Sequence, residues 1–540
     1  MRAAADLLAE ALSKAGCRKA FGMPGGEVLR LLQALEEAGI TFHLAKHETA
    51  AGFMAEGVFQ VTGQPAILLA TLGPGLTNGV NAIANAWQDR VPLIVLTGCV
   101  DPIDQVTYTH QVFDHVRLME TVTKGSFTLV DGAVAIVAEK ALRLALEGRP
   151  GPVHIDVPIS LAGKEQPPGP SFHPPVLGER LPGGSALEDA REAYRKAKHP
   201  LIIAGMEVLH QGAEEALSQF AKTEGIPVIT TYKAKGILEE DHPLALGGAG
   251  LSPRADELLL PLVAEADFLL LAGYDPIEMR HGWKHPWDPA KVPVVELTTS
   301  AHYHGVHQAT VSLEGSIGAA LKALSEIHGL AQGEERSFWD GDRLPRLRQQ
   351  MAERFPRDEG WGPAAVIDEA RKALPQDGIA TVDSGAHRIL LSQIWSCNLP
   401  RKLLQSTGFC TMGCALPLAI GAKLANSERP VMAFTGDAGL EMVMGELATL
   451  RDLGLPITII VFVDASLALI ELKQRRNGQE NRGVDFGRTN FPALAEAMGG
   501  HGITVKTREE LRQALEEASS RAHFTLIAAE IGRHSYDGRF

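Results

Sequence analysis

Gly436-Asp437-Ala438-Gly439, with Asp464 following 27 residues after Asp437, is the stretch of this chain that decides its fold. The apolar residues 430–435 predict a buried strand that ends at this turn. Residues 441–453 predict a helix, and residues 456–463 predict the next buried strand, which ends at Asp464. Two carboxylates at the ends of neighbouring parallel strands, beside a turn of small residues, suit a hard divalent cation and a diphosphate. The stretch therefore predicts a strand–helix–strand unit with a metal and phosphate site at its carboxyl edge.

Short apolar runs bounded by Gly, Pro or Asp alternate with helical patterns along the whole chain. They predict strands over residues 66–71, 92–97, 201–204, 227–231, 268–272, 293–297, 379–382, 431–435, 457–463 and 525–529. Alternation of this kind is typical of parallel, doubly wound sheets that helices cover on both faces. We therefore expect an α/β protein.

Two segments interrupt the alternation. Residues 163–185 are rich in Pro and Gly and predict an extended linker. Residues 330–361 are charged and contain only a surface helix, which we expect over 346–354. A chain of 540 residues is too long for one hydrophobic core. We expect three domains, each a doubly wound parallel sheet, over residues 1–165, 185–328 and 358–540.

Composition and charge exclude several classes of protein. The formal net charge of −14 is spread along the chain without a basic stripe, which argues against a nucleic-acid partner. No apolar run is long enough to cross a bilayer. Residues 1–16 include Asp6 and Glu10 and predict an amphipathic helix rather than a signal peptide. Five scattered cysteines fit a reducing compartment, so we expect a cytoplasmic enzyme without a membrane partner.

The motif at the strand ends resembles the signature of thiamine-diphosphate enzymes, in which Gly-Asp-Gly is followed one βαβ unit later by Asn or Asp. The resemblance implies that Asp437, Asp464 and the main-chain carbonyl of Ser466 bind Mg²⁺. Ala438 stands where this family usually has Gly, a change that is tolerable if the backbone there is not at positive φ. On the motif alone, a solvated Asp beside an ordinary surface turn is the alternative.

A second part of the resemblance lies near the N-terminus. A glycine turn at residues 22–26 is followed by His47-Glu48 at a predicted helix start, and then by the turn Gly73-Pro74-Gly75. This order is similar to the pyrimidine-binding domain of thiamine-diphosphate enzymes. It implies that Glu48 hydrogen-bonds the aminopyrimidine ring of the cofactor and activates it. The structural alternative for Glu48 is an acid at a helix N-terminus that the helix dipole stabilises.

The third domain supplies the remaining implied contacts with the cofactor. Residues 381–387 end a predicted strand in a glycine turn, at the place of the family's first diphosphate contact. Residues 408–413 resemble the element whose Met wedges between the two cofactor rings, although most Met side chains merely fill gaps in a core. Besides Glu48, the resemblance implies these cofactor-binding residues: Gly385, Ala386, His387, Cys410, Met412, Gly436, Asp437, Ala438, Gly439, Asp464, Ser466, Leu467 and Ala468.

Residues 109–114, 273–278 and 464–474 are similar to segments of the FAD-independent, catabolic branch of the acetolactate synthase group. This likeness implies that Gln111 and Gln474 face the reacting carbonyls, where amide donors can steady oxyanion charge. Two surface or capping glutamines are the alternative. Two residues depart from this pattern. Glu27 replaces the Lys expected after the first Pro-Gly pair, so an anion-handling group is missing, and Leu467-Ala468 replace a Tyr-Gly pair, which reshapes the pocket.

The resemblance implies an enzyme that uses thiamine diphosphate and Mg²⁺ to decarboxylate a 2-oxo acid such as pyruvate, with carboligation to a second carbonyl compound. Because Glu48 and the metal motif lie in different domains, and sites in this family form between chains, we expect a homodimer or a tetramer of two dimers. The alternatives left open are a non-ligating 2-oxo acid decarboxylase, a 2-hydroxyacyl-CoA lyase, a flavoenzyme similar to pyruvate oxidase and a non-catalytic paralogue. FAD in the middle domain is possible but not favoured, and the glycine run at 247–250 is too weak a signal to decide between these alternatives.

Overall fold

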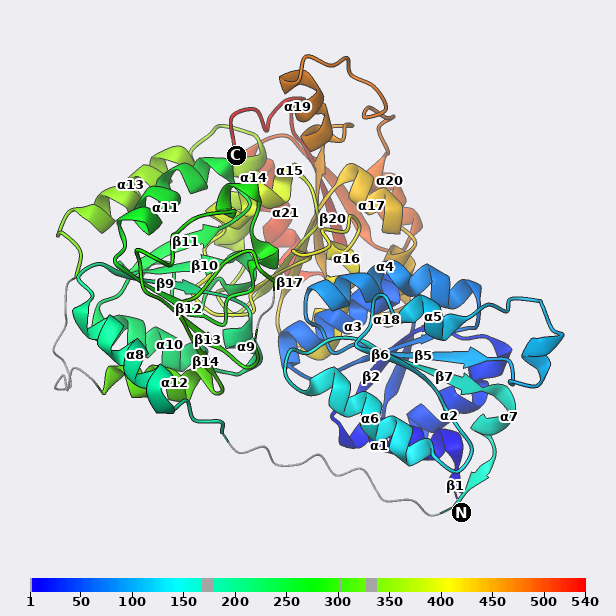
Figure 1. The fold of residues 1–540 in the computed structure, drawn as a ribbon. Coiled ribbons are helices and arrows are strands. Elements are labelled where there is room, and N and C mark those ends of the chain that lie inside the picture. Colours follow the sequence, from blue (N-terminus) through cyan, green and yellow to red (C-terminus); the bar gives the residue numbers. More distant parts are fainter. Residues whose placement is uncertain (1, 168–178, 302–303, 327–337) are drawn as a thin grey trace.

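The structure is a computed structural model that describes residues 2–167, 179–301, 304–326 and 338–540. Three six-stranded sheets form its framework, and every strand pairing within them is parallel. Helices cover both faces of each sheet (Figure 1). The predicted α/β class with three doubly wound parallel sheets is therefore confirmed. No described helix is both long enough and apolar enough to span a membrane.

The first sheet has the strand order β3-β2-β4-β5-β7-β6. Its strands are β2 (Lys19–Met23), β3 (Thr41–Leu44), β4 (Ile67–Ala70), β5 (Ile94–Cys99), β6 (Gly125–Thr128) and β7 (Val153–Pro158). Helices α1 (Ala4–Lys14), α2 (Leu29–Glu37) and α6 (Val134–Leu146) share one core, and α3 (Glu48–Thr62) and α4 (Pro74–Gln88) share another. Shorter elements are α5 (His115–Met119), α7 (Ile159–Ala162) and the antiparallel pair β1 (Arg2–Ala3) and β8 (Glu165–Gln166).

The third sheet repeats the connection order of the first, as β16-β15-β17-β18-β20-β19. Its strands are β15 (Ile379–Val382), β16 (Leu403–Gln405), β17 (Val431–Gly436), β18 (Thr458–Val463), β19 (His501–Val505) and β20 (Thr525–Glu530). Its helices are α14 (Pro363–Ala373), α15 (Ala386–Ile394), α16 (Ala415–Ala425), α17 (Asp437–Val443), α18 (Glu446–Leu453), α19 (Ala468–Arg476), α20 (Phe491–Ala497) and α21 (Arg508–Ser520).

The middle sheet has a different order, β11-β10-β9-β12-β13-β14. Its strands are β9 (Pro200–Ala204), β10 (Val228–Thr231), β11 (Ala245–Ala249), β12 (Phe268–Ala272), β13 (Val294–Thr298) and β14 (Val311–Glu314). The helices are α8 (Gly184–Lys196), α9 (Glu207–His210), α10 (Glu214–Glu224), α11 (Pro253–Glu265), α12 (Ile317–Ser325) and α13 (Arg343–Arg354). This order reverses between β9 and β12, where Gly205 N donates to Ala272 O (2.9 Å) and Glu207 N donates to Gly273 O (3.1 Å). These bonds draw the two strand ends together.

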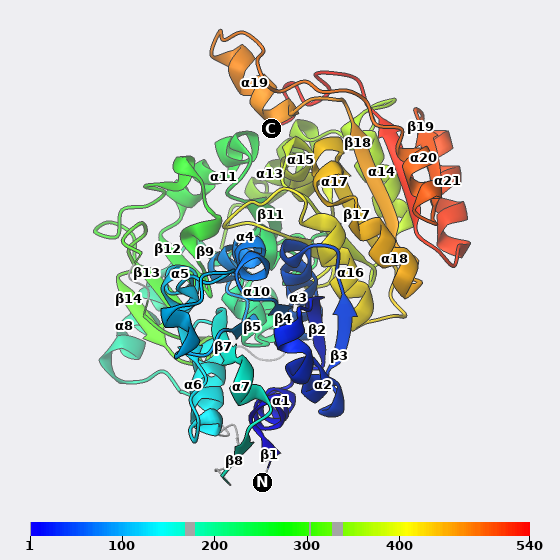
Figure 2. The same cartoon turned by 90° about the vertical axis from the view of Figure 1, so that its right-hand side faces the viewer.

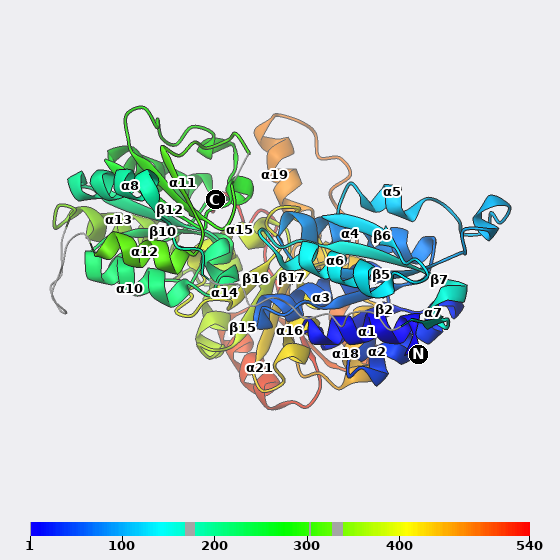
Figure 3. The ribbon, with the colours of Figure 1, turned by 60° about the horizontal axis from the view of Figure 1, so that its bottom comes forward.

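The first and third sheets pack against each other through α3 and α16 (Figure 2). An ideal Cβ on Gly57 would lie 2.4 Å from the carbonyl oxygen of Leu418, and one on Gly421 would lie 2.0 Å from that of Met54. Only glycine permits this close approach of two helix backbones. The third sheet shares a hydrophobic core with each of the other two, and it lies between them in Figure 3.

Each predicted strand is present, with ends that differ by at most two residues from the expectation. The helix predicted over 441–453 is wrong in one respect, because the structure has two helices, α17 and α18, separated at Met444-Gly445. The interruption lies where the first domain packs on this segment, since Lys46 N donates to Glu446 Oε1 (2.9 Å). The predicted surface helix is present as α13. Residues 168–178 of the predicted linker and residues 330–337 of the charged segment lie outside the described residues. The domain boundaries stay a prediction.

Candidate active site

A cavity of about 230 Å³ lies at the carboxyl edge of the third sheet. The strand order reverses there between β15 and β17, and in open α/β sheets ligands bind in the crevice beside such a reversal. Most of its lining residues lie at the ends of three strands. They are Ser384, Gly385, Ala386 and His387 after β15, Gly436, Asp437, Ala438 and Gly439 around the end of β17, and Asp464, Ser466, Leu467, Ala468, Leu469 and Ile470 after β18. The other lining residues are Cys410, Met412, Phe462 and Tyr536. Every cofactor-binding residue that we predicted in the third domain lines this one cavity.

The two predicted metal ligands are linked by main-chain hydrogen bonds. Asp437 Oδ2 accepts from the backbone N–H groups of Asp464 (3.1 Å) and Ala465 (2.7 Å), and its Oδ1 accepts from Ala438 N (2.9 Å). Asp464 Oδ1 in turn accepts from Ser466 N (3.2 Å). Ala465 has a φ of 56°, in the left-handed region, so the loop after β18 turns sharply around the Asp437 carboxylate. The geometry holds both carboxylates at one edge of the cavity.

The electrostatics of this pair suit a divalent cation. Burial and the nearby charge of Asp437 together raise the pKa of Asp464 to about 7. Burial also raises the pKa of Asp437. Two buried carboxylates repel each other, and none of the described lining residues is a Lys or Arg. A hard cation with oxygen ligands would relieve this repulsion, so the donor set fits Mg²⁺.

The start of α15 offers unsatisfied groups to an anion at the same cavity. No side chain caps this helix after Gly385, so its first backbone N–H groups are not bonded within the helix or by a cap. Oriented N–H groups at a helix start are a common site for phosphate. His387 is buried, its Nε2 has no hydrogen-bond partner among the described residues, and burial together with the Arg388 charge lowers its pKa to about 3. A neutral imidazole in this place leaves room for a partner that a ligand supplies.

Ala438 and Cys410, which both line this cavity, have different backbone conformations. Ala438 lies within α17 and is not at positive φ, so its methyl group is accommodated without strain. Cys410 has a φ of 57°, where a glycine would be favoured. Its Sγ donates to the carbonyl of Thr407 (2.9 Å) and accepts from Arg388 Nη2 (3.2 Å). These two bonds hold the loop that carries Met412.

Glu48 lies apart from this cavity, at the first position of α3, with only 5% of its surface exposed. Its Oε2 accepts from Asn78 Nδ2 (3.1 Å) on α4. An ideal Cβ on Gly75 would lie 3.3 Å from Oε1, so this glycine keeps the space beside Oε1 open. The position agrees both with the predicted cofactor contact and with a helix-start acid, and the role of Glu48 stays a prediction.

The other two predicted catalytic residues also lie away from the third-domain cavity. Gln111, with a φ of 59°, lines a separate cavity of about 390 Å³ in the first domain. The Gln474 amide donates to the carbonyl of Arg482 (2.9 Å), and Gln474 lines neither cavity. The Glu27 carboxylate, which replaces an expected Lys, accepts from Leu72 N (3.0 Å) and from the Thr71 hydroxyl. In a single chain the third-domain cavity therefore gathers the predicted metal ligands and the cofactor-binding residues of that domain, but not Glu48, Gln111 or Gln474.

Sequence reasoning missed five residues that line the third-domain cavity, namely Ser384, Phe462, Leu469, Ile470 and Tyr536. Phe462 could have been found, because it stands two residues before Asp464 and side chains two apart on a strand share a face. Tyr536 follows the last strand and carries no local signal. Its hydroxyl is buried without a hydrogen-bond partner among the described residues.

Three family models match consecutive parts of the chain. The N-terminal TPP binding domain of thiamine pyrophosphate enzymes matches residues 2–118, their central domain matches residues 187–324, and their C-terminal TPP binding domain matches residues 383–529. The chain belongs to the thiamine pyrophosphate enzyme family and is a thiamine-diphosphate-dependent enzyme, as the sequence resemblance predicted.

Within this family the chain is similar to acetolactate synthases. It is 30% identical to the acetolactate synthase large subunit of Lactococcus lactis subsp. lactis over 527 residues, which cover 95% of this chain and 89% of that protein. It is 29% identical to the acetolactate synthase of Bacillus subtilis over 526 residues, covering 95% and 90%. It is 28% identical to the catabolic acetolactate synthase of Raoultella terrigena over 524 residues, covering 95% and 92%.

Proposed function

We propose that this protein uses thiamine diphosphate and Mg²⁺ to decarboxylate a 2-oxo acid, with pyruvate as the donor, and to join the product to a second carbonyl compound. The observation that carries the proposal is the cavity where Asp437, Asp464 and the uncapped start of α15 meet. Carboxylates supply hard ligands to the cation, and the N–H groups suit the diphosphate. When bound, thiamine diphosphate stabilises the negative charge left on the substrate carbon after CO₂ departs.

In this proposal the chain's own residues hold Mg²⁺ and hold, orient and activate the cofactor. Asp437, Asp464 and the Ser466 carbonyl would bind Mg²⁺, and the half-buried Met412 would pack against the cofactor. The Glu48 carboxyl would share a proton with a nitrogen of the aminopyrimidine ring. Asn78 fixes one oxygen of that carboxyl and leaves the other free for the exchange. Gln111 and Gln474 are proposed to donate to the reacting carbonyls.

We propose that a complete site is formed by two copies of the chain. The described residues that line the third-domain cavity include none from the first sheet, so Glu48 of the same chain does not reach it. Large apolar side chains are exposed near the third-domain cavity, including Met442 (62% exposed) and Phe409 (46%). Phe113 (40%) is exposed near Gln111 in the first domain. A second chain placed over these side chains would remove their apolar surface from water. We propose a homodimer, or a tetramer of two dimers, with sites between chains.

A flavin is not part of this proposal. In sheets with the strand order of the middle domain, a dinucleotide binds beside the reversal of that order. The glycine run at residues 247–250 lies at the end of β11, an edge strand two places from that reversal, so it does not form a phosphate-binding turn beside the reversal.

Product analysis tests the proposed reaction. Purified protein with Mg²⁺, thiamine diphosphate and pyruvate is expected to release CO₂ and to form acetolactate, and Asp437→Ala is expected to lose at least about 100-fold in turnover because a cation ligand is missing. Carbon-13 NMR of the reaction mixture identifies the product. Acetaldehyde without acetolactate would favour a non-ligating decarboxylase. Failure to consume pyruvate or any other 2-oxo acid would contradict the proposal.

A further inference from the structure

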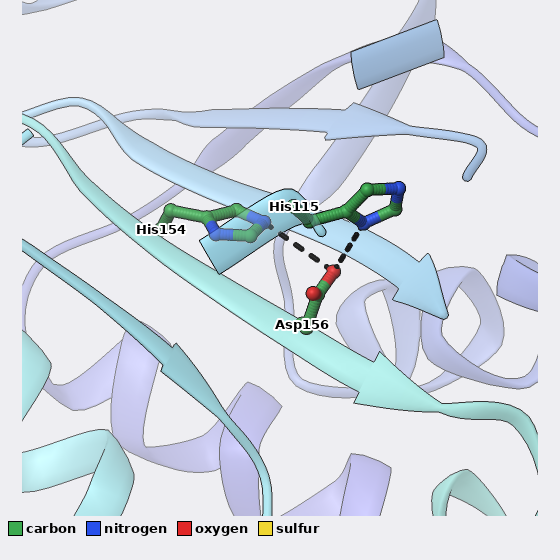
Figure 4. A group of neighbouring side chains, drawn as sticks. All are labelled: His115, His154 and Asp156. Carbon is green, nitrogen blue, oxygen red and sulfur yellow. Dashed lines mark hydrogen bonds and ion pairs between the residues drawn. The ribbon is translucent and has the colours of Figure 1, made fainter. Parts of the chain in front are cut away.

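A buried hydrogen-bond network lies under the Gly73-Pro74-Gly75 turn of the first domain. It contains His115 at the start of α5, Thr97 on β5, and His154 and Asp156 on β7. Both imidazoles point at the Asp156 carboxylate (Figure 4). His154 is fully buried, and His115 and Asp156 are at most 5% exposed. His115 and Asp156 also line the cavity that Gln111 lines.

The hydrogen bonds of His115 assign its protons. Gly73 N–H donates to His115 Nε2 (3.1 Å), so this nitrogen carries a lone pair. His115 Nδ1, 2.9 Å from Asp156 Oδ1, is therefore the protonated nitrogen and donates to the carboxylate. The ring thus joins the backbone of the glycine turn to a buried, ionised Asp.

The remaining hydrogen-bond donors and acceptors of the network can be assigned in the same way. The Thr97 hydroxyl donates to Asp156, so Thr97 Oγ1 accepts from His154 Nε2 (2.7 Å), and His154 Nδ1 accepts from the Ser126 hydroxyl (2.7 Å). Burial disfavours the charge of Asp156, but the hydrogen bond from His115 and the nearby His154 imidazole outweigh it and hold its pKa below the usual value. Each named donor therefore meets one acceptor around a single negative charge.

A metal site is the competing interpretation of this cluster, because ligand atoms of His115, His154 and Asp156 lie within 4.8 Å of one another. A metal on His115 Nδ1 would require that nitrogen to lose its proton, and a neutral ring would then carry the proton on Nε2. Nε2–H would face Gly73 N–H, and two donors would oppose each other. The hydrogen bond from Gly73 therefore argues against a metal.

We propose that the Asp156–His115 pair is a positioning unit for Glu48 and Gln111, an inference that rests on the proposed function. Gly73, held by His115, directly precedes α4, and Asn78 in the second turn of α4 donates to Glu48. An ideal Cβ on Gly73 would lie 2.6 Å from the carbonyl oxygen of Gln111. One imidazole therefore fixes the turn that touches Gln111 and the helix that orients Glu48.

Two substitutions of His115 separate its two hydrogen bonds. His115→Gln places an amide oxygen near the former Nε2 and can still accept from Gly73 N–H. His115→Asn places an amide nitrogen near the former Nδ1 and can still donate to Asp156, but it leaves Gly73 N–H unpaired. If His115 holds the glycine turn, His115→Asn should lower kcat and the exchange rate of the cofactor C2 proton about 10- to 100-fold, because small misplacements of catalytic groups have effects of this size. His115→Gln should retain most of the wild-type kcat and exchange rate.

The measurements are kcat and KM with pyruvate, C2 proton exchange by quenched-flow NMR, and the cofactor dissociation constant. We expect the last to change less than about threefold in both variants, because neither touches the third-domain cavity. Wild-type exchange in His115→Asn, or equal losses in Asn and Gln, would overturn this inference alone. A wild-type protein that shows no C2 exchange would instead contradict the proposed function.

A measurement on the unaltered protein covers the case in which a variant does not fold. Nitrogen-15 NMR of histidine-labelled wild-type protein should show a buried imidazole with the proton on Nδ1, assigned to His115 by the contact between its ring and Gly73 N–H. A proton on Nε2 of that ring would overturn the inference. So would uptake of one Zn²⁺ per chain that removes the Nδ1 proton of that ring, because it would assign the cluster to a metal.

Discussion

Glu48→Gln is expected to lower turnover by about 100- to 10,000-fold, the usual contribution of a general acid–base group. Gln has the same length and can still accept from Asn78 through its amide oxygen, so the local structure should persist. It cannot share a proton with a ring nitrogen, so the cofactor would bind without being activated. The measurements are kcat with pyruvate, C2 proton exchange and cofactor affinity by tryptophan fluorescence.

The matched control for this variant is Glu37→Gln, the same substitution at an exposed site at the end of α2. It should leave turnover, exchange and cofactor affinity unchanged. If Glu48→Gln keeps kcat within about threefold of the wild type, the carboxyl has no part in the chemistry, and a helix-start acid is the correct interpretation.

Lys233→Met is expected to lower the free energy of unfolding by about 3–5 kcal/mol, the usual result of removing one partner from a buried ion pair. The Lys233 Nζ lies 2.7 Å from Asp89 Oδ2 and 3.6 Å from Glu56 Oε1, and all three side chains are buried. Asp89 also accepts from the backbone N–H of Gly408 (2.9 Å), at the loop that leads to Met412. The cluster joins all three domains, and urea denaturation measures the loss.

The pH dependence of stability gives this prediction a second readout. Burial raises the pKa of Glu56 to about 7 from 4.5, the Asp89 charge adds to the rise, and Lys233 opposes it. The folded protein therefore holds a proton that the unfolded chain releases, so stability from this group falls as pH rises from about 4.5 to 7. Lys233→Met should extend this loss of stability to higher pH, and Glu56→Gln should remove the pH dependence that this group causes. Equal slopes in wild type and Glu56→Gln would contradict this account.

The fold and the third-domain cavity could largely be predicted from the sequence because their signals are local. Apolar runs bounded by Gly, Pro or Asp mark buried parallel strands, and parallel strands bring their carboxyl ends to one edge. The side chains after β15, β17 and β18 had to meet there once the strand order was fixed. Asp437 and Asp464 therefore lie together, although 27 residues separate them.

What the sequence did not predict depends on contacts between distant segments. The interruption between α17 and α18 lies where Lys46 of the first domain packs, and no local breaker of a helix except Gly445 announces it. Tyr536 reaches the cavity only because the chain returns there after β20. His115 and Asp156 are far apart in sequence, and their pairing depends on the packing of α5 against β7.

The claim that one cofactor site combines Glu48 of one chain with Asp437 of another has a direct test. Chains carrying Glu48→Gln and Asp437→Ala are co-expressed with different tags, and the mixed dimer is isolated by both tags. Each parent homodimer should be nearly inactive. In the mixed dimer one site carries both substitutions and the other carries neither, so about half of the wild-type turnover with pyruvate is expected. A mixed dimer as inactive as its parents would contradict the claim, because each site would then draw both residues from one chain.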